Sequence, residues 1–215
     1  MPVNCFKIFI LFLLMLIYSY SYGQEFKVST EPYNLKIDDQ RIEGYQRTFD
    51  FPYKKMKKEF WRFVTDFGVL KNWRSHYEII VPPGDKATAE TRIYAMVIPA
   101  KTGALIATGK HETAMKGVPP AKLDALARQT LEEFQLYFFQ KWLQEKIEDL
   151  EKESPKLSKK QARFSRKLER WQSKANPSNE KIARGKEDLA NIQNSLTQTL
   201  EQLDSYRAKL AALLK

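Results

Sequence analysis

The stretch LQEKIEDLEKESPKLSKKQARFSRKLERW, residues 143–171, decides the fold of the C-terminal half of this chain. Nine of its residues recur at alternating steps of four and three, beginning at Leu143 and ending at Trp171. We call them the seam residues, and in order they are Leu, Ile, Leu, Ser, Leu, Gln, Phe, Leu and Trp. This heptad spacing places the apolar residues on one helix face. It predicts a helix that packs lengthwise against another helix.

The partner helix is predicted further along the same chain, over residues 182–213, which repeat the heptad spacing. Asn176-Pro177 breaks the pattern between the two stretches. Because the stretches are similar in length and the connection is short, we expect an antiparallel helical (coiled-coil) hairpin. The polar seam residues Ser154, Gln161 and Thr199 either fix its register or mark a weak coil.

Pro155 lies inside the first heptad stretch. Proline lacks a backbone N–H, so we expect a kink or an interruption there, with Ser154 as the cap if the helix restarts. The heptad phase continues through the proline, which favours a kinked rod over two unrelated helices. Residues 154–215 are therefore predicted to form a kinked coiled-coil hairpin.

Upstream of the hairpin, residues 121–153 are predicted to form one long helix. Its stripe of apolar residues is wide enough to cover a sheet: Leu123, Ala127, Leu131, Phe134, Phe138 and Trp142. A helix of this length measures roughly 50 Å, whereas strands of six to ten residues measure about 20–33 Å. We therefore expect the helix to cover the sheet and to project beyond it.

Residues 24–120 are predicted to form an α+β domain. Alternating apolar residues and turn signals place one strand before a helix and three strands after it. These elements are expected at residues 41–51 (strand), 53–67 (helix), 77–81, 91–98 and 104–113 (strands). The last two strands form a hairpin, and Asp38-Asp39 is a turn before the first strand. The fold class is thus α+β, a small antiparallel sheet packed on the long helix.

The N-terminal residues 1–23 have the pattern of a secretory signal peptide. The apolar run Ile8–Ile17 follows a lone Lys7 and ends in Ser21-Tyr22-Gly23. We expect cleavage after Gly23 and a secreted or periplasmic location. The alternative is a retained membrane anchor, although a membrane span needs about 20 apolar residues. Cleavage would also remove Cys5, the single cysteine of the chain.

Positive charge is concentrated in one predicted helix. The formal net charge is +10, and residues 151–175 hold 9 Lys and Arg against 3 Asp and Glu. The helix is basic through Lys156, Lys159, Lys160, Arg163, Arg166, Lys167, Arg170 and Lys174. These residues form either a solvated face or contacts with an anionic surface, such as lipid head groups, acidic polysaccharide or an acidic protein. The predicted location outside the cytoplasm argues against nucleic acid as the partner.

The sequence carries no pattern that favours catalysis. Its two histidines, His76 and His111, are far apart in strand-like stretches, and the usual hydrolase, phosphate-loop and metal-binding motifs are missing. We predict a protein that is not an enzyme and that uses no cofactor or metal. A heptad hairpin can exchange arms between copies, so a homodimer through the hairpin is a further expectation.

Four short stretches resemble the opening of START/SRPBCC helix-grip domains. They are Phe49-Asp50-Phe51-Pro52, Phe60-Trp61, Val64-Thr65-Asp66-Phe67 and Leu70-Lys71-Asn72-Trp73. The resemblance implies a curved antiparallel sheet that grips a C-terminal helix, here the helix from Ala121, around a cavity for an apolar ligand. The order of elements is also similar to half of a TATA-binding-protein-like fold.

Two functions follow from these patterns. The first is a secreted or cell-envelope interaction module that acts through its helical hairpin on a protein partner or an anionic envelope surface. The alternative is carriage of an apolar ligand in a helix-grip cavity, with core packing as the competing role for the same residues. The lining would be Phe60, Trp61, Phe63, Trp73, Tyr94, Met96 and Phe138.

Overall fold

The structure is a computed structural model that describes residues 30–82, 91–110, 119–174 and 178–214. The chain divides after Tyr137 into two compact units. The predicted signal peptide, the break at Asn176-Pro177 and His111 lie outside the described residues. Within the described ranges, none of the helices combines the length and the hydropathy of a membrane span.

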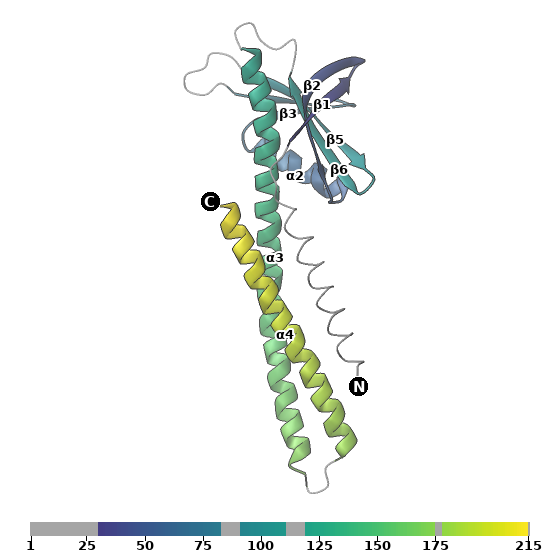
Figure 1. The fold of residues 1–215 in the computed structure, drawn as a ribbon, viewed down its shortest axis with the longest axis vertical. Helices are drawn as coiled ribbons and strands as arrows, with labels where there is room; N and C mark the ends of the chain where they lie inside the picture. The colour runs from purple at the N-terminus through teal and green to yellow at the C-terminus, as the bar shows by residue number, and fades with distance from the viewer. Residues whose placement is uncertain (1–29, 83–90, 111–118, 175–177, 215) are drawn as a thin grey trace, which may run out of the picture. The chain divides into compact units, whose positions relative to one another are not determined.

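The first unit contains a six-stranded antiparallel sheet, which confirms the α+β class (Figure 1). Its strands are β1 (Glu31–Ile37), β2 (Gln40–Phe49), β3 (Val69–Asn72), β4 (Tyr77–Val81), β5 (Thr91–Ala100) and β6 (Gly103–Lys110). The order across the sheet is β1-β2-β6-β5-β4-β3. As expected, β5 and β6 form a hairpin.

Two of these strands, β1 and β3, were not expected from the sequence pattern. Strand β3 has only four residues, and β1 contains proline and lysine, so neither gives a strong strand signal. Asp38 and Asp39 do form a turn, but it joins β1 to β2 rather than preceding the first strand. Their φ angles of 46° and 66° are left-handed, as a two-residue hairpin loop requires.

One face of the sheet packs against helix α2 (Tyr53–Thr65) and the beginning of helix α3 (Pro120–Gln172). Phe134 of α3 is the centre of this core. Its ring lies 5.1 Å from the ring of Phe60 and 5.6 Å from that of Phe49, both in edge-to-face geometry. All three side chains are almost fully buried. The core is therefore filled by interlocking aromatic rings.

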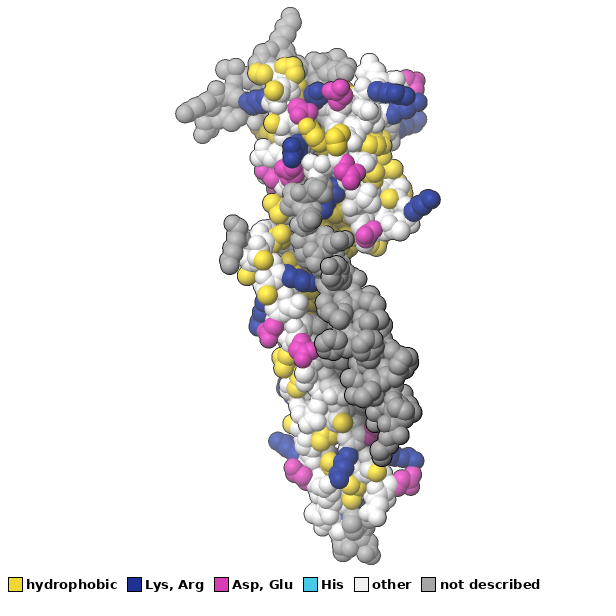
Figure 2. Space-filling view, in the orientation of Figure 1, with side chains coloured by type: hydrophobic (Ala, Val, Ile, Leu, Met, Phe, Trp, Pro, Cys, Tyr) yellow, Lys and Arg dark blue, Asp and Glu magenta, His cyan; other side chains and the backbone are white. Residues whose placement is uncertain are grey.

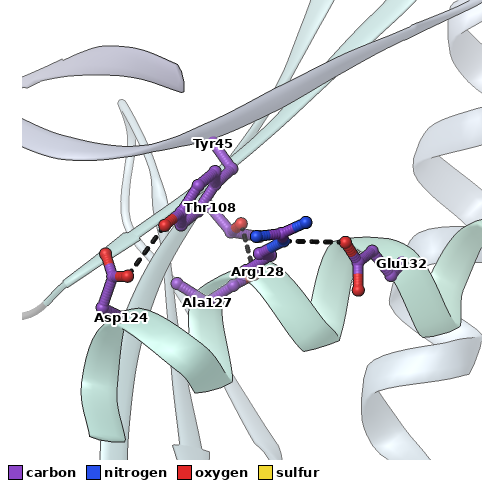
Figure 3. Close-up of polar contacts among 6 residues, drawn as sticks. All are labelled: Tyr45, Thr108, Asp124, Ala127, Arg128 and Glu132. Carbon is purple, nitrogen blue, oxygen red and sulfur yellow. Dashed lines mark hydrogen bonds and ion pairs between the residues drawn. The ribbon is translucent and has the colours of Figure 1, made fainter. Parts of the chain in front are cut away.

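Two polar contacts fix the first turns of α3 on the sheet (Figure 3). Tyr45 Oη donates a hydrogen bond of 2.8 Å to a carboxylate oxygen of Asp124. Thr108 Oγ1, which is buried, donates one of 2.7 Å to the carbonyl oxygen of Ala127. The two donors come from neighbouring strands, so together they set the rotation of the helix about its axis.

The opposite face of the sheet is covered by the sheet's own first hairpin. Leu35, Ile37 and Ile42 of β1 and β2 form a second core with Ala107 of β6. Tyr33, Tyr94, Met96 and Leu105 pack around it. The β1–β2 hairpin therefore folds back over β6 and β5, and both faces of the central strands are buried.

A pair of glycines allows this fold-back. Gly44 of β2 is directly opposite Gly109 of β6. A Cβ atom on Gly44 would overlap the carbonyl oxygen of Thr108 and would lie 2.7 Å from Gly109 Cα. A Cβ on either glycine would come within 2.9 Å of Leu35 Cδ1. The strands can approach this closely only because neither position carries a side chain.

The second unit is a helical hairpin formed by α3, from Phe138 onward, and α4 (Asn179–Leu213). The helices are antiparallel (Figure 1): Trp142 contacts Tyr206, with ring centroids 5.8 Å apart, and Gly185 packs against Trp171. Ser178 caps α4, because its hydroxyl accepts a hydrogen bond from the backbone N–H of Lys181.

Helix α3 continues through Pro155, as the unbroken heptad phase favoured, and the alternative of an interruption at this proline does not occur. Ser154 is not a cap, because it lies inside the helix and its carbonyl accepts a hydrogen bond from the Ser158 hydroxyl. The proline ring removes one backbone hydrogen bond, but the apolar seam on either side of it packs continuously against α4. Tertiary packing therefore overrides the local helix-breaking effect.

The heptad seam was predicted correctly in position. Every seam residue from Leu143 to Trp171 and from Ile182 to Leu213 is buried or half-buried, whereas most residues between them are exposed. The polar seam residue Thr199 is buried, and its hydroxyl donates to the carbonyl of Ser195 in its own helix. Because the Thr199 hydroxyl bonds within its own helix, the two helices are held together at this point of the seam by van der Waals packing.

Replacing Gly44 by alanine should destabilise the first unit by about 3 kcal/mol, because the added methyl group overlaps the backbone of β6. Amide hydrogen exchange in β2 and β6 measures this loss as a lower free energy of opening. The control is Thr48→Ala, an exposed position on the same strand, which should change the free energy by less than about 0.5 kcal/mol. Equal effects of the two variants would refute the close approach.

Replacing Gly185 by leucine should lower the stability of the hairpin by about 1–3 kcal/mol, since a Cβ there would lie 2.9 Å from Trp171 Cζ3. Adding Trp171→Ala should recover part of this loss, because the smaller residue makes room for the leucine. Urea unfolding followed by far-UV circular dichroism tests both variants. If the losses in free energy of unfolding caused by Gly185→Leu and by Trp171→Ala simply add in the double variant, these two residues do not face each other.

Candidate functional site

The residues predicted to line an apolar cavity occupy several separate environments. Phe60 and Phe63 are buried on α2, and both rings pack against Phe134. Trp61 lies on another side of α2, is 41% exposed and makes an edge-to-face contact with Tyr77. Of the three predicted lining residues on α2, only Phe60 and Phe63 therefore belong to the core between the helices and the sheet.

The other predicted lining residues lie elsewhere. Tyr94 and Met96 face the second core, under the β1–β2 hairpin. Trp73 follows β3 and is 53% exposed. Phe138 is buried in the second unit, where its ring contacts that of Phe139. The structure thus distributes the set over both faces of the sheet, and its buried members contact other aromatic rings, which favours core packing as their role.

Two of the predicted lining residues, Trp73 and Tyr94, instead contribute to a surface pocket of about 420 Å³ in the first unit. It lies where the tip of the β1–β2 hairpin reaches the loop between β3 and β4. Its lining consists of Asp38, Trp73, Arg74, Ser75, His76, Glu78 and Tyr94. In the sheet order, β1 and β4 are separated by three strands, so this pocket exists only because the hairpin folds back.

His76 contacts several other residues of this pocket. Its ring stacks on Trp73, with centroids 6.2 Å apart and an interplanar angle of 21°, and it meets Tyr94 edge-on at 5.1 Å. A hydrogen bond of 3.0 Å joins His76 Nδ1 and Ser75 Oγ. The Trp73 backbone N–H donates to the His76 carbonyl at 2.9 Å. These contacts fix the imidazole and the indole as one stacked pair.

Burial lowers the pKa of His76 below its ordinary value, because desolvation disfavours the charged imidazolium. The negative charges of Asp38 and Glu78 act in the opposite direction but are the smaller causes. Glu78 is itself buried and forms an ion pair of 3.0 Å with Arg92 of β5. The pocket therefore holds a neutral histidine between aromatic rings at neutral pH.

The sequence pattern did not indicate this pocket. The pattern predicts a turn at Asp38, which is correct, and a strand-like stretch at His76, which instead lies in the loop directly before β4. Asp38 and His76 line the same pocket only because the β1–β2 hairpin folds back over the sheet, and no local sequence pattern predicts this fold-back. A second pocket, of about 620 Å³, lies along β1 and β2, but two of its polar residues are engaged with each other, Tyr45 with Asp124.

The second unit carries the basic stripe, which we define by the eight cations named from the sequence. All of them are exposed. None makes an ion pair with a carboxylate in the described part of the chain, whereas Arg184 and Arg207 pair with Glu180 and Glu151 at 2.6 Å. Lys167 lies 4.8 Å from the centre of the Trp171 ring, a cation–π contact.

Comparisons of this chain with protein-family models, curated proteins and solved structures found no match. The resemblance to START/SRPBCC domains stays a prediction.

His76 should titrate below its ordinary pKa of 6.5. The unfolded chain then takes up this proton at a higher pH than the folded chain, so stability falls as the pH falls from 6.5 toward the lowered pKa. Titration of the two histidine rings by NMR tests the shift. The variant His76→Gln should remove this part of the pH dependence of unfolding, and a pKa at or above 6.5 would contradict the buried placement.

Proposed function

We propose that this protein is a non-enzymatic interaction module of the cell envelope or the secreted space, whose helical hairpin binds a linear acidic polysaccharide. The basic stripe is the observation that carries the proposal. Eight exposed cations without carboxylate partners among the described residues lie close together, seven of them in one stretch of α3 and Lys174 just after its end. Such a concentration of uncompensated charge attracts polyanions and speeds their association.

The stripe is narrow and straight. At 3.6 residues per turn, its seven members within α3 fall within an arc of roughly 120° on the helix surface, beside the apolar seam. From Lys156 to Arg170 these seven extend about 21 Å along the axis, and Lys174 follows the end of the helix. Figure 2 shows Lys and Arg side chains on the hairpin surface, near the end where α3 gives way to α4. A one-dimensional row of cations matches the repeated charges of an extended chain.

The remaining faces of this region favour a linear partner over a membrane. The apolar seam of α3, including Leu168, packs against α4, so these side chains are not available for insertion into lipid. The facing part of α4 has balanced charges: Lys181, Arg184 and Lys186 against Glu180, Glu187 and Asp188. A flat anionic surface would meet both helices, whereas a linear chain can follow α3 alone.

The predicted signal peptide supports the same partner class. A protein outside the cytoplasm meets acidic polysaccharides more often than nucleic acid. The proposal also needs no catalytic group in the hairpin. Exposed lysines and arginines are sufficient for electrostatic binding, which salt screens strongly at distances beyond about 10 Å.

Binding to polygalacturonate, a linear carboxylated polysaccharide, tests the proposal directly. The variant Lys159→Glu, Arg163→Glu, Arg166→Glu, Arg170→Glu should bind at least about tenfold more weakly, and binding by the natural sequence should weaken with added salt. A matched control reverses four exposed lysines of the first unit instead: Lys36, Lys54, Lys58 and Lys101. It has the same net charge and should keep most of the affinity.

Equal loss in the control would show that only the overall charge matters and would overturn the proposed site. Binding to vesicles with anionic lipids, but not to polygalacturonate, would overturn the partner class. Far-UV circular dichroism checks that both variants keep their helices.

A further inference from the structure

We propose that the pocket around Trp73 and His76 binds a neutral sugar ring. The pocket combines an exposed indole with a rim of hydrogen-bonding groups of both kinds. It belongs to the first unit, so it is a site separate from the basic stripe. The inference does not depend on the polyanion proposed for the hairpin.

The charge of the lining selects for a neutral ligand. Asp38 and Glu78 are negative, but the charge of Glu78 is compensated by its ion pair with Arg92. Arg74, on the same rim, balances Asp38. A strongly charged ligand would therefore meet a group of its own sign, whereas a neutral polar ligand meets none that repels it.

The indole of Trp73 supplies the apolar surface that such a ligand needs. One face of the ring stacks on His76, and 53% of the residue remains exposed. An exposed aromatic ring beside hydrogen-bonding groups offers both the apolar surface and the polar rim that a ligand of mixed character needs. A pyranose ring is polar at its rim and apolar on its C–H face, so it can stack on the open side of the indole.

The position of this indole is fixed before any ligand arrives. The backbone N–H of Trp73 donates to the carbonyl of His76, and the imidazole beneath the indole is held by Ser75 and by the edge of Tyr94. A ligand would not have to immobilise the ring on binding. Such preorganisation removes part of the entropic cost of association.

The rim offers both acceptors and donors for hydroxyl groups. Asp38 provides carboxylate oxygens, and Arg74 provides a fork of N–H donors. Neither side chain makes a hydrogen bond or ion pair with another residue in the described ranges. Each sugar hydroxyl both donates and accepts, so neighbouring hydroxyls can satisfy the two groups together. The volume of about 420 Å³ lies within the range of about 300–1,000 Å³ typical of ligand pockets.

Saturation-transfer NMR with the full chain tests this site, using three neutral tetrasaccharides as probes: cellotetraose, maltotetraose and tetra-N-acetylchitotetraose. At least one of them should receive saturation from the protein. The variant Trp73→Ala should weaken that binding at least tenfold, and Asp38→Asn should weaken it severalfold, while Trp73→Phe should retain part of it. Trp61→Ala is the matched control, because Trp61 is also exposed but lies outside the pocket.

Transfer to none of the three tetrasaccharides would overturn the proposal. Equal weakening by Trp61→Ala and Trp73→Ala would overturn it as well, as would displacement of the bound sugar by tetramethylammonium, which would indicate a cation cage. The four-residue charge reversal in the basic stripe should leave tetrasaccharide binding unchanged. This comparison separates a failure of the pocket from a failure of the polyanion site.

Discussion

The close approach of β2 and β6 at Gly44 and Gly109 is the constraint on which the first unit depends. Because neither residue has a side chain, Leu35 can pack over both positions, and the β1–β2 hairpin folds back across the sheet. The fold-back buries the second face of the central strands. It also carries Asp38 to Trp73 and His76, which lie beyond three intervening strands. The close approach at the two glycines therefore accounts for both the second core and the pocket around His76.

The two proposed binding sites differ in their physical means of recognition. The pocket depends on shape and on a fixed aromatic pair, with balanced charges around it. The basic stripe depends on charge density along a stable rod, and the seam between α3 and α4 keeps that rod rigid. Neutral sugar rings and acidic sugar chains both occur in glycans outside cells. The two proposals together therefore describe a glycan-binding module, although each is tested separately.

The sequence predicted those features that depend on local periodicity. The heptad spacing located the hairpin and its seam, and the apolar alternation located most of the sheet. It did not predict β1 and β3, whose patterns are short or interrupted by polar residues and proline. The pocket could not be predicted, because Asp38 and His76 meet only through pairings between distant strands. At Pro155 the local propensity allowed an interruption, whereas the heptad phase favoured one continuous rod, and α3 is continuous there.

The fold-back at the two glycines can be observed directly by NMR in solution. A NOESY spectrum with labelled leucine methyl groups should show cross-peaks from a δ-methyl group of Leu35 to the Hα protons of Gly44 and of Gly109. The cross-peak to Gly109 of β6 requires the hairpin to lie over that strand, whereas the cross-peak to Gly44 is a contact within β1 and β2. If the Leu35 methyl groups show contacts only within β1 and β2, the hairpin does not fold back, and the pocket around His76 is not formed.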